Sequence, residues 1–120
     1  MLATRAHRSG LEAMSDEESA QLGALLRALA QATQAVTGAT RIYSLSFNEA
    51  VPHFHMHIIP RFAEHASTQS WALADFYRSV AGGTEHGADA ATAARVASEI
   101  ASEVRTLLPA VWSASSITHG

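Results

Sequence analysis

Three histidines in strict alternation are the side chains whose type and spacing best suit chemistry. Residues 53–59 read His-Phe-His-Met-His-Ile-Ile. In a β-strand alternate side chains share one face, so neighbouring histidines stand about 6.6 Å apart along one side. Imidazole is neutral and nucleophilic near pH 7, and it can also carry a proton or ligate a metal. With the apolar side chains against a core on the opposite face, the strand presents His53, His55 and His57 to a ligand.

Two other interpretations of these histidines stay open at this point. In the first, each is a hydrogen-bonded, partly exposed residue without a function, since histidine is intermediate in burial. In the second, all three form a metal site with Glu49 or Glu64 as a further ligand, because His-x-His often begins a zinc site. Three ligands along one straight strand diverge, however, whereas tetrahedral coordination needs ligands that converge. We therefore predict no bound metal.

Composition excludes several other kinds of site. The chain has 120 residues, 48% of them hydrophobic, no cysteine and a formal net charge of −3. This length suits one domain with its own core. Without cysteine there is no disulfide, thiolate metal site or cysteine nucleophile. There is no basic block to bind duplex nucleic acid and no apolar run suited to a membrane or a signal peptide, so we predict a cytoplasmic protein.

A long helix is expected before the histidine segment. Ser15 and Glu18 form a capping box, and the acidic residues between them favour the positive end of a helix. Leucines and a valine then fall on one helical stripe until Gly38 ends the helix.

Two strands are expected to form an antiparallel hairpin. From Arg41 the apolar period becomes two, which predicts a strand through Phe47. Residues 48–50 form a short turn, and a second strand runs from Val51 to Ile59 before Pro60 ends it. The expected fold class is therefore α+β.

Two further helices are expected after the hairpin. The first carries an apolar stripe from Leu73 to Val80 and ends at the glycine pair that follows. The second is capped by Asp89, runs to Leu108 and ends at Pro109.

The whole pattern of residues 53–59 resembles the H-φ-H-φ-H-φ-φ signature of the histidine-triad (HIT) family, where φ is hydrophobic. Pro60 and Arg61 resemble the ending found in the family's hydrolase branches. The preceding chain is similar to the second half of the family domain, with a strand, a crossing helix and a hairpin. The resemblance covers residues 1–61, leaving 62–112 as a C-terminal helical extension and 113–120 as a frayed tail. It implies one α+β domain whose antiparallel sheet, bearing the triad hairpin, packs against helices.

The resemblance implies a nucleotidyl-histidine mechanism with a role for each histidine. His55 would attack the α-phosphorus of a nucleotide and leave a covalent phosphoramidate that water hydrolyses. His53 and His57 would orient the nucleophile, bind phosphate oxygens and help to protonate the leaving group. His7 matches an outer fourth histidine that completes this network through the last triad member. The implied function is a nucleotide hydrolase or nucleotidyl transferase acting on a dinucleoside polyphosphate, a nucleoside phosphoramidate or a similar compound, without a cofactor.

Two more residues are candidates for substrate binding. Asn48 resembles an asparagine that contacts phosphate in the family, although turn chemistry alone would also place asparagine there. Arg61 could add positive charge. Where the family often has a Gly-Gln-Ser/Thr-Val loop, this chain has Glu49, which is negative, and Ala50, which lacks a hydroxyl. A nucleotide-binding module with little or no activity is therefore the alternative function.

The resemblance also implies a partner subunit. In the family, a strand, a helix and another strand precede the part that matches Leu2 to His7, and they build much of the ribose and base pocket. Two expectations remain open: residues upstream of Met1 complete this segment, or a second subunit lends the missing edge. Because exposed edge strands are generally covered, we expect a homodimer that binds a small nucleotide substrate.

Overall fold

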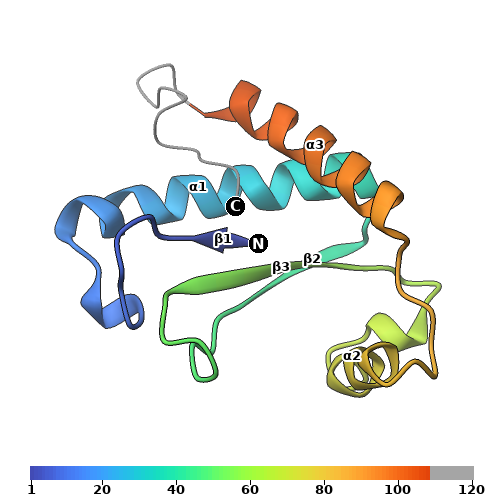
Figure 1. Cartoon of the computed structure of the whole chain (residues 1–120). Coiled ribbons are helices and arrows are strands. Elements are labelled where there is room, and N and C mark those ends of the chain that lie inside the picture. Colours follow the sequence, from blue (N-terminus) through green and yellow to red (C-terminus); the bar gives the residue numbers. More distant parts are fainter. Residues whose placement is uncertain (109–120) are drawn as a thin grey trace.

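The computed structural model describes residues 1–108, so the expectations for Pro109 and for the tail from residue 113 lie outside the described residues. The described part is α+β, with a three-stranded antiparallel sheet and three helices (Figure 1). The strands are β1 (Leu2–Ala3), β2 (Arg41–Leu45) and β3 (His55–Arg61). The helices are α1 (Asp16–Thr37), α2 (Leu73–Ala81) and α3 (Ala90–Leu107), with short 3₁₀ turns at Leu11–Ala13 and Ala66–Thr68.

The helices α1 and α3 form a layer on one side of the sheet. Figure 1 shows α1 lying over the strands, α3 packed on the far side of α1, and α2 on the other side of the sheet. Ala28 and Ala32 of α1 pack against Val104 and Leu108 in a buried cluster. The small alanine side chains let the two helices approach closely, and this contact holds four of the eight buried hydrophobic residues in the described part of the chain.

The predicted start and end of α1 are confirmed. The Ser15 hydroxyl accepts the Glu18 N–H at 3.2 Å, and the Glu18 carboxylate accepts the Ser15 N–H at 2.7 Å. The pKa of Glu18 lies below its ordinary value of 4.5. The largest cause is the hydrogen bond from the Ser15 backbone, and the second is a hydrogen bond from the Arg8 side chain. Gly38 ends the helix with a left-handed φ of 70°, which glycine adopts without steric cost.

The two later helices are also confirmed. Helix α2 begins at the predicted Leu73 and ends beside Gly82, while Asp89 caps α3 by accepting the Thr92 N–H at 2.9 Å. Hydrogen bonds from Thr92 lower the pKa of Asp89 below 3.8. No helix within residues 1–108 is both long enough and apolar enough to cross a bilayer.

The antiparallel pairing of β2 with β3 is confirmed, and β3 lies in the middle of the sheet order β1-β3-β2. The predicted bounds of β3 are wrong at both ends, because it begins at His55 instead of Val51 and continues through Pro60 to Arg61.

The position of Pro60 within β3 has a simple geometric reason. The Phe54 carbonyl accepts the Thr4 N–H on the β1 side, while the Arg61 carbonyl accepts the Thr40 N–H on the β2 side. Backbone groups alternate along a strand, so Pro60 would direct its missing N–H toward the β1 side. There β1 pairs only with His55 and Met56, so no ladder bond is lost at Pro60.

The predicted strand to Phe47 and the short turn at 48–50 are also wrong, because β2 ends at Leu45 and residues 46–54 form the connection. The Ser46 hydroxyl donates to the His55 carbonyl at 2.7 Å. The Asn48 side-chain oxygen accepts the His55 N–H at 2.9 Å. The side chains of Ser46 and Asn48 thus bind the carbonyl and the N–H of His55. The regular pairing of β2 with β3 therefore ends at Leu45 and His57.

The two faces of β3 differ in what covers them. Phe54, just before the strand, is 1% exposed on the α1 side, as the alternation predicted. On the other face, Leu45 of β2 stands opposite His57 and Tyr43 stands opposite Ile59. Tyr43 and Leu45 of β2 therefore lie on the histidine face, whereas Ile42, opposite Pro60, lies on the α1 face.

Candidate active site

Four predicted histidines gather at one end of the sheet. His7 follows β1, His53 precedes β3, and His55 and His57 lie on β3. The ring centroids of His7 and His53 are 5.5 Å apart, and those of His55 and His57 are 5.3 Å apart. The fold thus brings together residues separated by up to fifty positions in the sequence.

The His55 ring is oriented by a hydrogen bond to the main chain. Its Nδ1 lies 2.8 Å from the His53 carbonyl oxygen. A carbonyl can only accept, so Nδ1 is the protonated nitrogen of the ring. In neutral His55 the free lone pair is therefore on Nε2, which is the form that a nucleophilic imidazole needs.

The His53 ring is engaged at both nitrogens. Nε2 lies 2.8 Å from the Thr4 carbonyl and must donate to it, so Nδ1 accepts when His53 is neutral. This Nδ1 lies 3.4 Å from the Nδ1 of His7, which is then the donor. The resemblance implied that His7 acts through the last triad histidine; the contact is with the first, because β1 runs alongside the start of β3.

The His57 ring is exposed and meets the His55 ring edge to face at an interplanar angle of 82°. Within residues 1–108 its nitrogens make no hydrogen bond to protein groups. Of the three triad rings, His57 is therefore the one whose nitrogens can both meet a ligand.

Asn48, predicted to contact phosphate, holds the main chain of His55. Its Nδ2 donates to the Ser46 hydroxyl at 3.0 Å, while its Oδ1 accepts the His55 N–H. Its φ of 58° is left-handed, a conformation that asparagine tolerates better than most residues. Ser46 was missed at the sequence level, where it counted only as the polar face of a strand.

Arg61, also predicted to bind substrate, is not brought to the histidines. It ends β3 six residues beyond His55, which corresponds to about 20 Å along a strand. Its Nη1 is shielded from solvent and lacks a hydrogen-bond partner. This separation arises because β3 runs on past Pro60 instead of turning back, and substrate binding by Arg61 stays a prediction.

The metal alternative finds no ligand set in the described part of the chain. Within residues 1–108, no three histidine, aspartate or glutamate side chains come close enough together to hold a metal ion. Glu49 and Glu64 are exposed, and the Nδ1 atom of His55 faces a carbonyl instead of converging with the other rings.

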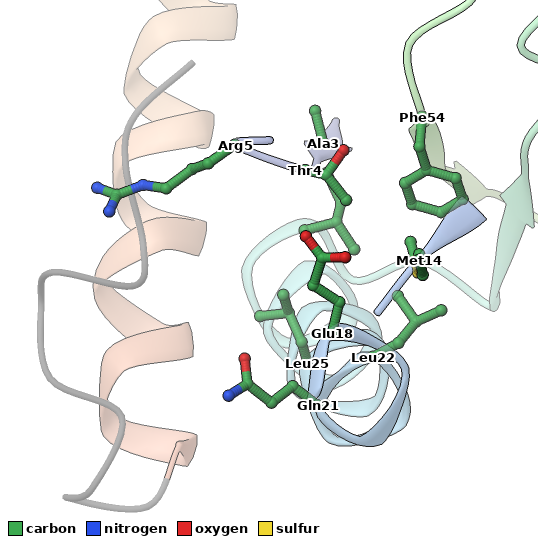
Figure 2. Close-up of a pocket in the computed structure, with 10 residues that line it drawn as sticks. Ala3, Thr4, Arg5, Met14, Glu18, Gln21, Leu22, Leu25 and Phe54 are labelled. Carbon is green, nitrogen blue, oxygen red and sulfur yellow. The ribbon is translucent and has the colours of Figure 1, made fainter. Parts of the chain in front are cut away.

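Two hollows flank the sheet. One, of about 270 Å³, lies between β1 and α1, where Figure 2 shows the Phe54 ring pointing toward Met14 and Leu22. No histidine lines it. The other, of about 450 Å³, lies on the histidine face and is bordered by His57 and α2.

Comparisons of this chain with models of protein families, with curated proteins and with solved structures gave no match.

Proposed function

We propose that this chain is a histidine-triad nucleotide hydrolase or nucleotidyl transferase in which His55 is the nucleophile. One observation carries the proposal: His55 Nδ1 donates to the His53 carbonyl, which leaves the Nε2 lone pair free to attack phosphorus. The contacts among the rings of His53, His57 and His7 and the ring of His55 also support the proposal, because a histidine that is merely exposed to solvent does not require other histidines beside it.

The proposed reaction has two steps. In the first, His55 Nε2 bonds to the α-phosphorus, and the bond from phosphorus to the leaving group breaks. The leaving atom takes a proton from the imidazolium of His57, the triad ring without protein hydrogen bonds. In the second step water attacks phosphorus, the phosphorus–nitrogen bond breaks, and the lone pair returns to His55. His57 takes the proton of the water, which restores both rings; a transferase would use another nucleophile in place of water.

His53 and His7 act as positioning residues in this scheme. The Thr4 carbonyl fixes the tautomer of His53, and His7 donates to the remaining nitrogen. The His53 main chain in turn holds the His55 ring. His53, held at both ring nitrogens in this way, keeps the nucleophile in one orientation, which is what catalysis by a preorganised group requires.

A nucleotide-binding module of low activity is the second candidate, and one observation favours it. Arg61, the arginine predicted to add positive charge for substrate binding, stands about 20 Å along the strand from His55. The exposed Glu49 carries negative charge in the connection that precedes the triad. Such a protein would bind nucleotide without forming the covalent intermediate.

Trapping the intermediate separates the two candidates. The protein is mixed with a nucleoside phosphoramidate, quenched at alkaline pH and digested for peptide mass spectrometry. Nucleotidyl mass on His55 is expected, with none in His55→Ala and full labelling in His65→Ala, a control on an exposed histidine outside the cluster. Label on His53 or His57, or binding of nucleotide without any label, would overturn the assignment.

The proposal includes the cytoplasmic location and the homodimer expected from the sequence. Within residues 1–108 the outer edges of β1 and β2 have no partner strand, which is the condition that a second subunit would relieve.

A further inference from the structure

A largely apolar groove begins at His57 and extends between the sheet and α2. Its volume of about 450 Å³ lies in the range of small-molecule sites. Ile59 and Leu73 are 8% and 7% exposed and form its floor. Phe47 and Tyr77 are 75% and 52% exposed and form its rim. The groove therefore offers a buried apolar base between two accessible aromatic rings.

The groove exists because the strand register places apolar side chains on the histidine face. Leu45 stands opposite His57 across the β2–β3 pair and lines the groove beside it. Helix α2 covers only part of this surface, chiefly through Leu73. What remains open is continuous with the ring of His57.

We propose that this groove is the leaving-group subsite of the reaction and takes an uncharged aromatic group. The inference rests on the proposed function, in which His57 gives its proton to the leaving atom. His53 uses both ring nitrogens on protein groups, and His55 faces phosphorus. The atom that receives the proton from His57 therefore stands at the mouth of the groove, and the group attached to it extends inward.

The lining residues argue against a polyphosphate leaving group. Apart from His57, those lining side chains are apolar or carry a neutral hydroxyl, as Ser70 and Tyr77 do. Phosphate oxygens are usually held by arginine, lysine or clustered N–H donors. Burying their charge among apolar side chains without such partners would be costly. Among the substrates that the triad implies, the groove favours the phosphoramidate of an aromatic amine over a dinucleoside polyphosphate.

Two substrates that differ only in the leaving group test the inference. Adenosine 5′-phosphoramidates of phenethylamine and of methylamine share the nucleotide and the leaving nitrogen. We expect kcat/KM to be on the order of tenfold higher for the phenethyl compound, because its aromatic ring is transferred from water into the apolar groove. The double variant Phe47→Ser, Tyr77→Ser should bring this ratio close to one. Trp71→Ser removes an aromatic ring that is 94% exposed and outside the groove, so the ratio should stay unchanged.

The outcomes separate this inference from the function on which it rests. The groove is not the leaving-group subsite if the ratio of kcat/KM for the two phosphoramidates is near one in the unmodified protein, or if the double variant leaves that ratio unchanged. In either case the proposed hydrolysis that depends on His55 still stands. Faster turnover of a dinucleoside tetraphosphate than of the phenethyl compound also overturns the assignment of the groove. If neither phosphoramidate is hydrolysed, or if His55→Ala hydrolyses both at the unmodified rate, the proposed function itself fails and the inference fails with it.

Discussion

The α1–α3 layer and the histidine cluster are held by different forces. In the helical layer, Ala32 and Val104 are 0% and 3% exposed, and the contact is apolar. In the cluster the rings are half-buried or exposed, and hydrogen bonds to Thr4, Ser46 and Asn48 hold the main chain and one ring. Burial stabilises the first region, whereas directional hydrogen bonds define the geometry of the second.

This difference teaches where a substitution should act. Apolar burial is non-directional, so a change in the helical layer should alter stability while the folded molecules keep their chemistry. A hydrogen bond fixes an orientation at a modest net free energy, so a change in the cluster should alter turnover more than stability.

The largest expected effect is that of His55→Ala. Loss of the proposed nucleophile should lower kcat by several orders of magnitude, while nucleotide affinity changes only a few-fold, because a nucleophile acts in the transition state. Phosphoramidate hydrolysis and calorimetric binding measure the two quantities. Val104→Ala in the helical layer is the matched control and should leave kcat per folded molecule unchanged. Turnover by His55→Ala near that of the unmodified protein would erase the distinction between the two regions.

Phe54→Ala tests the residue that joins them, since Phe54 is buried on the α1 side and lies between two triad histidines. Removing a buried phenylalanine should lower the free energy of unfolding by about 3 to 5 kcal/mol. The lower end is expected because the ring already borders a hollow of about 270 Å³. Urea denaturation gives the value, with Trp71→Ala as the exposed control, expected within about 0.5 kcal/mol. A loss below 1 kcal/mol would mean that Phe54 does not anchor the strand.

Asn48→Gly removes the side chain that holds the His55 main chain while keeping a residue suited to a φ of 58°. We expect kcat to fall on the order of tenfold to a hundredfold, because the proposed nucleophile loses its fixed orientation, with a smaller change in KM. The free energy of unfolding should change by about 1 kcal/mol, the net contribution of a typical hydrogen bond. Ser44→Ala, which changes an exposed residue of β2, is the control. Equal effects on kcat from both variants would show that Asn48 does not position His55.

The smallest expected effect is a pH dependence of folding stability that arises at the start of α1 and does not involve the histidines. The folded-state pKa of Glu18 is lowered, so its hydrogen bonds contribute full stability above the ordinary value of 4.5. That contribution is lost as the pH falls through the folded-state pKa. Denaturation of the unmodified protein and of Glu18→Gln should therefore show a stability gap at pH 7 that closes toward pH 3. A gap that persists at pH 3 would mean that the charge of Glu18 does not contribute.

The helices could be predicted closely because their signals are local. Ser15 and Glu18 are three residues apart and bond to each other, and Gly38 needs no distant contact to adopt its conformation. The antiparallel pairing of β2 and β3 followed from two nearby alternating segments. The bounds of β3 could not be predicted in this way, because they depend on side chains outside the strand and on the limited length of β1.

The sequence predicted which histidines belong to the candidate site better than it predicted the contacts between them. Alternation along one strand predicts that His55 and His57 share a face, whatever the rest of the fold does. The contact of His7 with His53, the role of Ser46 and the distance of Arg61 depend on which segments lie side by side.

By itself, the sequence determined the capped helices, the α+β class and the apolar and histidine faces of the triad segment, because each depends on residues a few positions apart. Only the tertiary structure decided the tautomers of His53 and His55, the placement of Leu45 beside His57 and the groove under α2. Those features arise from hydrogen bonds and register between distant segments, and a one-residue shift of register would move each side chain of the shifted strand to the other face.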